Sequence, residues 1–326
     1  MIFKGIAATT KLDAHNMKIS KATLEEVAQN IESGGYALSV GVEHDHTIMP
    51  IGKVYSAYVD KFDEKDYALY IEQEIFDKAV SIVVDGEQFV IYKSEVDNRP
   101  FAFDELLSND KLKIITDPVN FENHERVAEY LDSLAAEFDI DVDYQFRKSV
   151  IPDPELIFEL VESSIKYYFI YMSSKKAIEK IGDATIDSVM KELGKLYAII
   201  KKAIRQGVSY LLPHNRPVTC VFKGNIDYII ELIIKTTNPD VAIRAISGDE
   251  LTEVFERLKD IKTRFQTLQK VQFIYDEVEK KWELNYLTTE TGEVIGTEKS
   301  HQRAAKLIDL HLGSSNKASV SLSGLG

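Results

Sequence analysis

Residues 51–75 read IGKVYSAYVDKFDEKDYALYIEQEI, and this stretch decides how the first part of the chain folds. Residues 51–59 and 67–75 are rich in the β-branched and aromatic side chains that favour strands. The polar, acidic segment DKFDEKD lies between them. The pattern predicts an antiparallel hairpin with its turn at residues 60–66.

Further strand-like segments surround this hairpin. Residues 2–8 and 36–42 precede it, and residues 88–94 follow the turn signal Asp85-Gly86. Short strands joined by such turns are typical of barrels and sandwiches. We therefore predict a closed or nearly closed β-barrel over residues 1–95.

One helix interrupts these strands. Thr23 and Glu26 have the spacing of a capping box, in which the hydroxyl accepts from a free amide and the carboxylate reaches back. The spacing predicts a helix over residues 22–33, packed on the barrel. Gly34 and Gly35 suit a left-handed cap at its end.

The pattern changes beyond Pro118, where helical spacing begins. Residues 151–154 read IPDP and mark a boundary, after which residues 155–206 have a helical pattern that Gly207 can end. The last third is mixed: we expect a hairpin about residues 224–225, an amphipathic helix from 248, strands with turns near 279–280 and 291–292, and a helix over about 300–312.

These segments together predict an α+β protein, with a β-barrel-like start, a helical middle and a C-terminal mixed antiparallel sheet with helices. The expected division is a β-rich domain at 1–116, a helical connector at 117–150, a helical and α+β domain at 151–312, and a flexible tail at 313–326.

Composition excludes several classes of protein. The formal net charge of the 326 residues is -14, which argues against a broad electrostatic grip on nucleic acid. The single cysteine, Cys220, excludes an intrachain disulfide and favours a reducing cytoplasm. We expect no signal peptide at the N-terminus and no membrane-spanning segment. We also expect no cofactor, because the chain contains no Walker loop and no GxGxxG motif.

Two histidines lie close together in residues 42–54, VEHDHTIMPIGKV. His44 and Asp45 could form a structural turn at the end of a strand, or His44 could act as a catalytic base. A third hypothesis is a metal site, in which His44 and His46 share one face of a continuing strand. Glu72 or Glu74 would then supply a third ligand.

The order of these elements resembles the N-terminal domain of the phage prohead (capsid-maturation) proteases, over roughly residues 1–100. The resemblance rests on AHNMKIS at 14–20, the capped helix, GVEHDHTIMPIGKV at 41–54 and the hairpin after it. Members of that family are His/Ser peptidases on a small barrel. The resemblance implies that His44 is the base, and that Ser94, which follows the Asp85-Gly86 turn, is the nucleophile.

The remaining catalytic positions are less defined. His124, Glu122 or Asp117 would be the third member of the site, and Ser81 is the alternative nucleophile. The family's small residues beside the serine are absent, because Glu95 follows Ser94. A negative charge there disfavours a developing oxyanion.

Two classes of function therefore remain open. One is a cytoplasmic serine peptidase that cleaves a protein substrate. The other is a non-catalytic binding or assembly module with a protein partner, acting as a phage structural factor or an antiviral defence component. We expect self-association in either case, with the apolar run YYFIYM at 167–172 as core or subunit interface. Lysines and one arginine on residues 186–206 form the most basic helix face, which we interpret as solvated.

Overall fold

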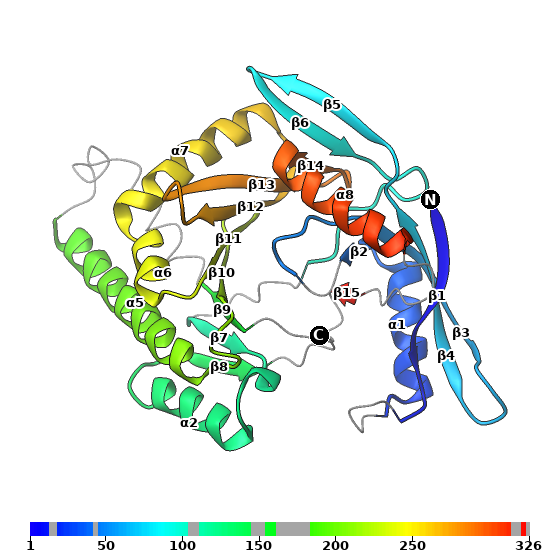
Figure 1. The fold of residues 1–326 in the computed structure, drawn as a ribbon, viewed down its shortest axis with the longest axis horizontal. Coiled ribbons are helices and arrows are strands. Elements are labelled where there is room, and N and C mark those ends of the chain that lie inside the picture. Colours follow the sequence, from blue (N-terminus) through cyan, green and yellow to red (C-terminus); the bar gives the residue numbers. More distant parts are fainter. Residues whose placement is uncertain are drawn as a thin grey trace. The chain divides into compact units, whose positions relative to one another are not determined.

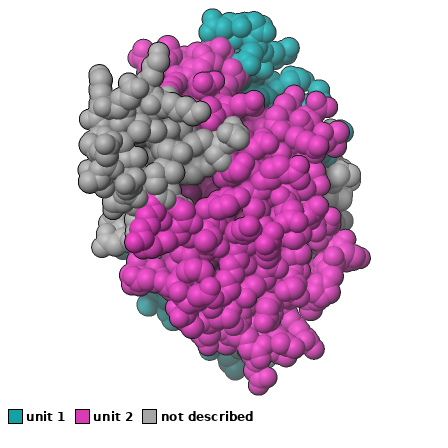
Figure 2. All heavy atoms as spheres, turned by 90° about the vertical axis from the view of Figure 1, so that its left-hand side faces the viewer, with its two compact units in different colours: residues 1–104, 286–326 teal, residues 105–285 magenta. Residues whose placement is uncertain are grey.

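The structure is a computed structural model that describes residues 1–12, 18–41, 45–103, 111–144, 154–160, 183–313 and 321–323. The chain divides into two compact units, which Figure 2 shows in different colours. Unit 1 comprises residues 1–104 and 286–326, and unit 2 comprises residues 105–285. Helices and strands both contribute, so the predicted α+β class is confirmed.

Unit 1 contains a five-stranded antiparallel sheet that curls like half of a barrel (Figure 1). Its strands, in spatial order, are β1 (Ile2–Thr9), β4 (Tyr67–Ile75), β3 (Gly52–Lys61), β2 (Leu38–Gly41) and β15 (Ser321–Ser323). β3 and β4 form the predicted hairpin, paired from Gly52↔Ile75 to Lys61↔Tyr67. Among the described strands this sheet stays open, with β1 and β15 at its ends, so the predicted barrel does not close.

The first helix of unit 1 is α1 (Lys21–Ser33), and it begins one residue before the predicted range of 22–33. The side chain of Ser20, rather than that of Thr23, caps it by accepting a hydrogen bond from the Thr23 amide at 3.1 Å. Gly34 ends the helix with φ of -67°, so the expected left-handed cap does not form. A glycine is needed there because a Cβ would lie 2.4 Å from the Asn30 carbonyl oxygen.

A second group of strands in unit 1 joins the two ends of the chain. β5 (Ala79–Val84) and β6 (Glu87–Tyr92) form a hairpin about Asp85 and Gly86, whose φ values of 50° and 84° fit a two-residue turn. β6 also pairs antiparallel with β14 (Val294–Thr297), and α8 (Glu298–Gly313) contacts both strands. The sequence division places residues 286–312 in a separate domain, whereas the structure joins them to the first 104 residues.

The core of unit 1 is built from both parts of the chain. Leu24, Ala28 and Ile31 of α1 are buried in one cluster with Val294 and Ala304. Because residues near both ends contribute side chains to this cluster, unit 1 needs both segments to exclude water from its core.

Unit 2 is built on a mixed sheet. Its strands, in order, are β13 (Lys281–Thr289), β12 (Leu268–Asp276), β11 (Ile229–Thr236), β10 (Val218–Asn225), β9 (Glu155–Glu159), β7 (Lys113–Thr116) and β8 (Asp141–Tyr144). β10 and β11 are the predicted antiparallel hairpin, and β9 and β12 flank them in parallel. β13 passes into unit 1 after Asn285.

Helices cover this sheet. They are α2 (His124–Ala135), α5 (Asp183–Tyr210), α6 (Pro239–Ala245) and α7 (Gly248–Arg264), with a short 3₁₀ turn, η1 (Pro118–Asn120). α5 contacts β9, and α6 contacts β11 (Figure 1). Among the described residues no helix is sufficiently long and apolar to span a bilayer.

The helical pattern predicted over residues 155–206 is wrong at its start, where Glu155–Glu159 form strand β9. Gly207 does not end the long helix either, because α5 continues to Tyr210. A Cβ on Gly207 would lie 2.5 Å from the Leu156 side chain and 3.2 Å from the Tyr130 hydroxyl. The glycine therefore serves close packing of α5 rather than helix termination.

Candidate functional site

The histidine-rich stretch is only partly described. Val42, Glu43 and His44 lie outside the described residues, so the catalytic role of His44 stays a prediction. Asp45 forms a turn with the next residues: its carboxylate accepts from the Thr47 amide at 2.8 Å and from the Thr47 hydroxyl at 2.7 Å. This local pattern is that of an Asx turn leading toward β3.

The hypothetical metal site includes His44, which lies outside the described residues. Within the described residues, no three acidic, histidine or cysteine side chains gather to hold an ion. The two proposed third ligands have other partners. Glu72 pairs with Lys4 at 3.3 Å and accepts from the Tyr55 hydroxyl at 3.1 Å. Glu74 accepts from the Ser94 hydroxyl and from the Glu95 amide.

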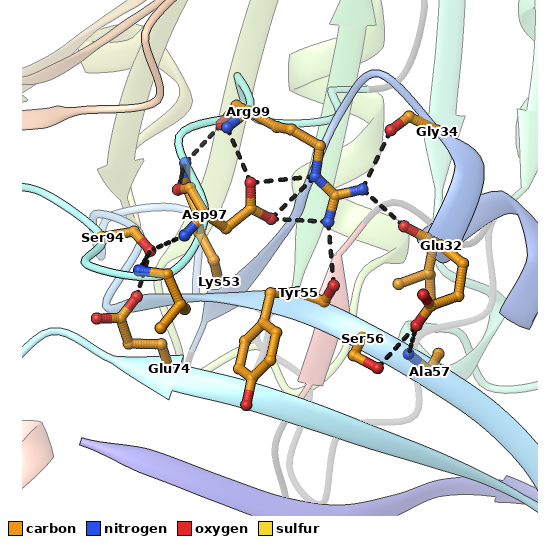
Figure 3. Close-up of polar contacts among 12 residues, drawn as sticks. Glu32, Gly34, Lys53, Tyr55, Ser56, Ala57, Glu74, Ser94, Asp97 and Arg99 are labelled. Carbon is orange, nitrogen blue, oxygen red and sulfur yellow. Dashed lines mark hydrogen bonds and ion pairs between the residues drawn. The ribbon is translucent and has the colours of Figure 1, made fainter.

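Ser94, the predicted nucleophile, lies in the turn that follows β6 and is 7% exposed. Its hydroxyl donates a hydrogen bond to the carboxylate of Glu74 on β4. Its oxygen also accepts from the amides of Val96 at 3.2 Å and Asp97 at 2.8 Å. Figure 3 shows the serine turned toward Glu74 and the Asp97 backbone. A hydroxyl has one proton and two lone pairs, so these three contacts use its hydrogen-bonding capacity in full.

The next residues of this turn continue a buried polar network. Arg99 binds the carboxylate of Asp97 through Nε, at 3.1 and 2.9 Å, and through Nη2, at 2.7 Å. The same guanidinium donates to the carbonyl oxygens of Ile31 at 2.7 Å, Gly34 at 3.1 Å and Tyr55 at 3.2 Å. Arg99 thereby ties the turn to the end of α1, whose last carbonyls lack partners within the helix, and to β3 (Figure 3).

The charges of this pair stabilise each other. Burial alone would raise the pKa of Asp97, but the hydrogen bonds from Arg99 outweigh it and hold the pKa of Asp97 below its usual value. The pair therefore remains ionised inside unit 1.

Lys53 is a second cation of the same network, and unlike Arg99 it is fully buried. It lies on β3 and is 0% exposed, and its ammonium donates to the carbonyl oxygens of Asp97 at 2.9 Å and Arg99 at 2.5 Å. The ammonium also lies 4.9 Å from the centre of the Phe101 ring. Burial lowers the pKa of Lys53 to about 8, against the attraction of Asp97. Such a lysine could be nucleophilic if a substrate reached it, but its complete burial leaves it a structural role.

Gly292, in the turn between β13 and β14, closes over this lysine. Its φ is 73°, and a Cβ there would lie 2.2 Å from both the Arg99 carbonyl oxygen and the Lys53 ammonium. Only glycine combines this left-handed conformation with so close an approach.

Glu32 fixes the neighbouring irregularity of β3. The register of β3 and β4 shifts between Val54 and Ser56, and the Glu32 carboxylate accepts there from the Ser56 hydroxyl and the Ala57 amide, both at 2.7 Å. The Ser56 hydrogen bond and then the Ala57 amide lower the pKa of Glu32. The carboxylate thus holds β3 directly after the bulge.

The other predicted catalytic residues occupy unrelated places. Ser81 is exposed on β5, opposite Val90 of β6. His124 is the exposed first residue of α2 in unit 2. Asp117 caps η1 by accepting from the Val119 amide at 2.9 Å.

Glu122 is also in unit 2, 3.9 Å from Arg126, in an exposed pair. The described residues therefore provide no catalytic triad within unit 1 that contains Ser94 and one of these partners.

Two polar clusters escaped the sequence analysis. In unit 1, the Tyr92 hydroxyl hydrogen-bonds to Nδ1 of His301, and burial raises the pKa of Tyr92 to about 12. In unit 2, Lys270 pairs with Glu231 at 2.7 Å, both almost fully buried. A signal existed for the second cluster at one of its charges, because Glu231 interrupts the apolar run IIELII at 229–234.

Two basic residues of α5 pair with acidic residues of unit 2. Lys202 pairs with Glu137, and Arg205 pairs with Asp240 at 2.9 Å. These pairs weaken the local positive field that a nucleic-acid partner would require.

Comparison with known proteins finds no relative from which a function could be transferred. No protein-family model, no curated protein and no solved structure matches the chain. The function must therefore be inferred from the described geometry, and no family can be assigned from these comparisons.

Proposed function

We propose that unit 1 is a non-catalytic binding or assembly module in which Ser94 has a structural role. The observation that carries this proposal is the saturation of the Ser94 hydroxyl by Glu74 and by two backbone amides. The resemblance to prohead proteases then concerns the order of elements, while the chemistry of the turn has changed.

The chemical argument concerns what a nucleophilic serine needs. Its proton must pass to a base, and a lone pair on its oxygen must be free to attack a carbonyl carbon. In this turn the proton is directed at Glu74, and both lone pairs accept amide hydrogens. A carboxylate can accept a proton, but an oxygen that already accepts from Val96 and Asp97 is a weakened nucleophile. Its 7% exposure also keeps a peptide carbonyl away.

The same contacts explain why the serine is useful to the fold. Glu74 is 5% exposed, and a carboxylate so deeply placed needs hydrogen-bond donors. The Ser94 hydroxyl and the Glu95 amide supply two. These two hydrogen bonds also connect β4 to the turn after β6. The same turn carries Arg99 and supplies the carbonyl oxygens that bind Lys53.

The wider setting is part of this proposal. A protein partner in the cytoplasm, within a phage structural assembly or an antiviral response, agrees with the acidic composition and the single, buried cysteine. The alternative, a serine peptidase with His44 as its base, makes the opposite prediction about Ser94 and can be separated by experiment.

A fluorophosphonate probe reacts with activated serines and tests the two functions directly. We expect no labelling of the full chain under conditions in which a known serine hydrolase is labelled. Labelling that disappears in both Ser94→Ala and His44→Ala, but persists in Ser81→Ala, would overturn the proposal and establish the peptidase.

A further inference from the structure

β5 is an edge strand with an unused row of backbone groups. It lies at the end of its sheet and pairs only with β6 among the described strands (Figure 1). Val84 and Glu87 flank the two-residue turn and exchange hydrogen bonds, and this exchange recurs at every second residue. Ala79, Ser81 and Val83 therefore direct their amide and carbonyl groups away from β6.

Exposed side chains of β5 lie on both faces of the hairpin. Val80 is 61% exposed and Val83 is 70% exposed, and the odd difference in their numbers puts them on opposite faces. The strand reads AVSIVV, without a charge or a proline. An exposed, uncharged and regular edge strand is a template for another strand.

The opposite situation holds at β1, the edge of the five-stranded sheet. β1 contains Lys4, and its register with β4 shifts between Ile6 and Ala8. A lysine and a bulge are the devices by which proteins prevent edge pairing. β5 has neither, and its register with β6 is regular throughout.

We propose that β5 pairs with β5 of a second copy of this chain, antiparallel and across a two-fold axis. Such an axis places residues of equal parity opposite each other. A register centred on Ser81 sets Ser81 opposite its copy, Ala79 opposite Val83, and Val80 opposite Ile82. The outward amide and carbonyl groups of one copy then meet those of the other copy. Val80 gains Ile82 of the second copy as an aliphatic neighbour, and Val83 gains Ala79.

Charge complementarity at the strand ends favours a second copy as the occupant. Lys78 precedes the strand and Asp85 follows it. Antiparallel pairing brings Lys78 of one copy to the end at which Asp85 of the other lies. Within its own chain Lys78 pairs with Glu95 at 2.5 Å, and Asp77, which would meet Asp85 in this register, pairs with the N-terminal ammonium at 3.1 Å. Both pairs are exposed, and such surface pairs contribute little, so Lys78 can exchange its partner for Asp85 of the second copy.

This inference deepens the proposed binding role by naming a partner, and the two are tested separately. Dimerisation can fail while Ser94 remains unreactive, and labelling of Ser94 can succeed in a dimer. A pair of six-residue strands has a small interface, so we expect a weak and reversible dimer. Since each chain has a net charge of -14, added salt should strengthen it by screening repulsion.

Sedimentation velocity of the full chain tests the proposal, at concentrations from about 1 μM to about 1 mM. We expect a shift from the 37.0 kDa monomer toward twice that mass. Val83→Lys, which adds a charge to the edge, should weaken the dimer by about tenfold or more. Val278→Lys is the matched control, because this valine is 86% exposed in a turn of unit 2, and it should not affect the dimer.

A cross-link tests the register. Residues opposite each other in a hydrogen-bonded pair have Cα atoms about 5.5 Å apart, within the range that a disulfide spans. Ser81→Cys should therefore give a covalent dimer under mild oxidation, while Val278→Cys should not, and the buried Cys220 stays unreactive. A chain that is monomeric at every concentration, or a dimer that Val83→Lys leaves intact, would overturn the proposal. If the chain is monomeric at every concentration, any strand that pairs with β5 must come from a different protein.

Discussion

The ammonium of the fully buried Lys53 donates to the backbone carbonyl oxygen of Arg99 at 2.5 Å, so this lysine is held by a peptide oxygen rather than by an acid. The guanidinium of Arg99 turns away and binds the Asp97 carboxylate. The network brings Lys53 and Arg99 together with the buried carboxylates of Asp97 and Glu74, and the stability that it contributes should depend on pH.

Lys53 should make the stability of the protein rise with pH. Its pKa is about 8 in the folded chain, below the usual value of 10.5. Between these values the unfolded chain holds a proton that the folded chain has released, so the free energy of unfolding increases as pH rises. The gain should be absent below pH about 8 and complete near pH 10.5.

The measurement is urea unfolding of the wild type and of Lys53→Met at pH 7.5 and 10. From pH 7.5 to pH 10, the free energy of unfolding of the wild type should rise by about 1–3 kcal/mol relative to that of Lys53→Met. A difference that is independent of pH would show that Lys53 titrates normally.

Ser94→Ala should destabilise unit 1. The substitution leaves the Glu74 carboxylate and two amides with one partner fewer, at a cost of about 1–3 kcal/mol. Ser81→Ala removes an exposed hydroxyl and should change stability by less than about 0.5 kcal/mol. Equal urea midpoints for the two variants would remove the structural role that we assign to Ser94.

Two glycines with left-handed backbones should respond differently to alanine. Gly86→Ala meets no atom within 4 Å and should cost only the conformational penalty, about 1–2 kcal/mol. Gly292→Ala also meets the Arg99 carbonyl and the Lys53 ammonium and should cost clearly more. Thermal unfolding of both variants by circular dichroism compares them, and the opposite order would contradict the closure over Lys53.

The two glycines of α5 provide a second matched pair. Gly194 is exposed, and a Cβ there meets nothing within 4 Å, so Gly194→Ala should stabilise by up to about 1 kcal/mol through helix propensity. Gly207→Ala should instead destabilise, because its Cβ would collide with Leu156. Chemical denaturation distinguishes the two, and a gain in stability at both positions would argue against close packing of α5 on β9.

The sequence by itself determined those elements whose signals are local. The hairpin of β3 and β4 and the turn at Asp85 and Gly86 follow from alternation and turn chemistry over a few neighbouring residues. The two helices α7 and α8 follow in the same way from their spacing. The prediction of Thr23 as the helix cap was wrong, because Ser20 lies one turn earlier with the same hydroxyl chemistry, and only the backbone path decides which hydroxyl meets a free amide.

Tertiary structure alone decided which distant segments meet. Nothing near β6 in the sequence specifies β14 as its neighbour, and nothing near Ser94 specifies Glu74 as its partner. Such pairings depend on how whole faces of strands and helices bury their apolar side chains, a balance over the entire unit. The resemblance in the sequence implied that Ser94 is a nucleophile, but the hydrogen-bond partners of a serine hydroxyl decide whether it can act as one. Those partners are set by strand pairing between residues far apart in the chain.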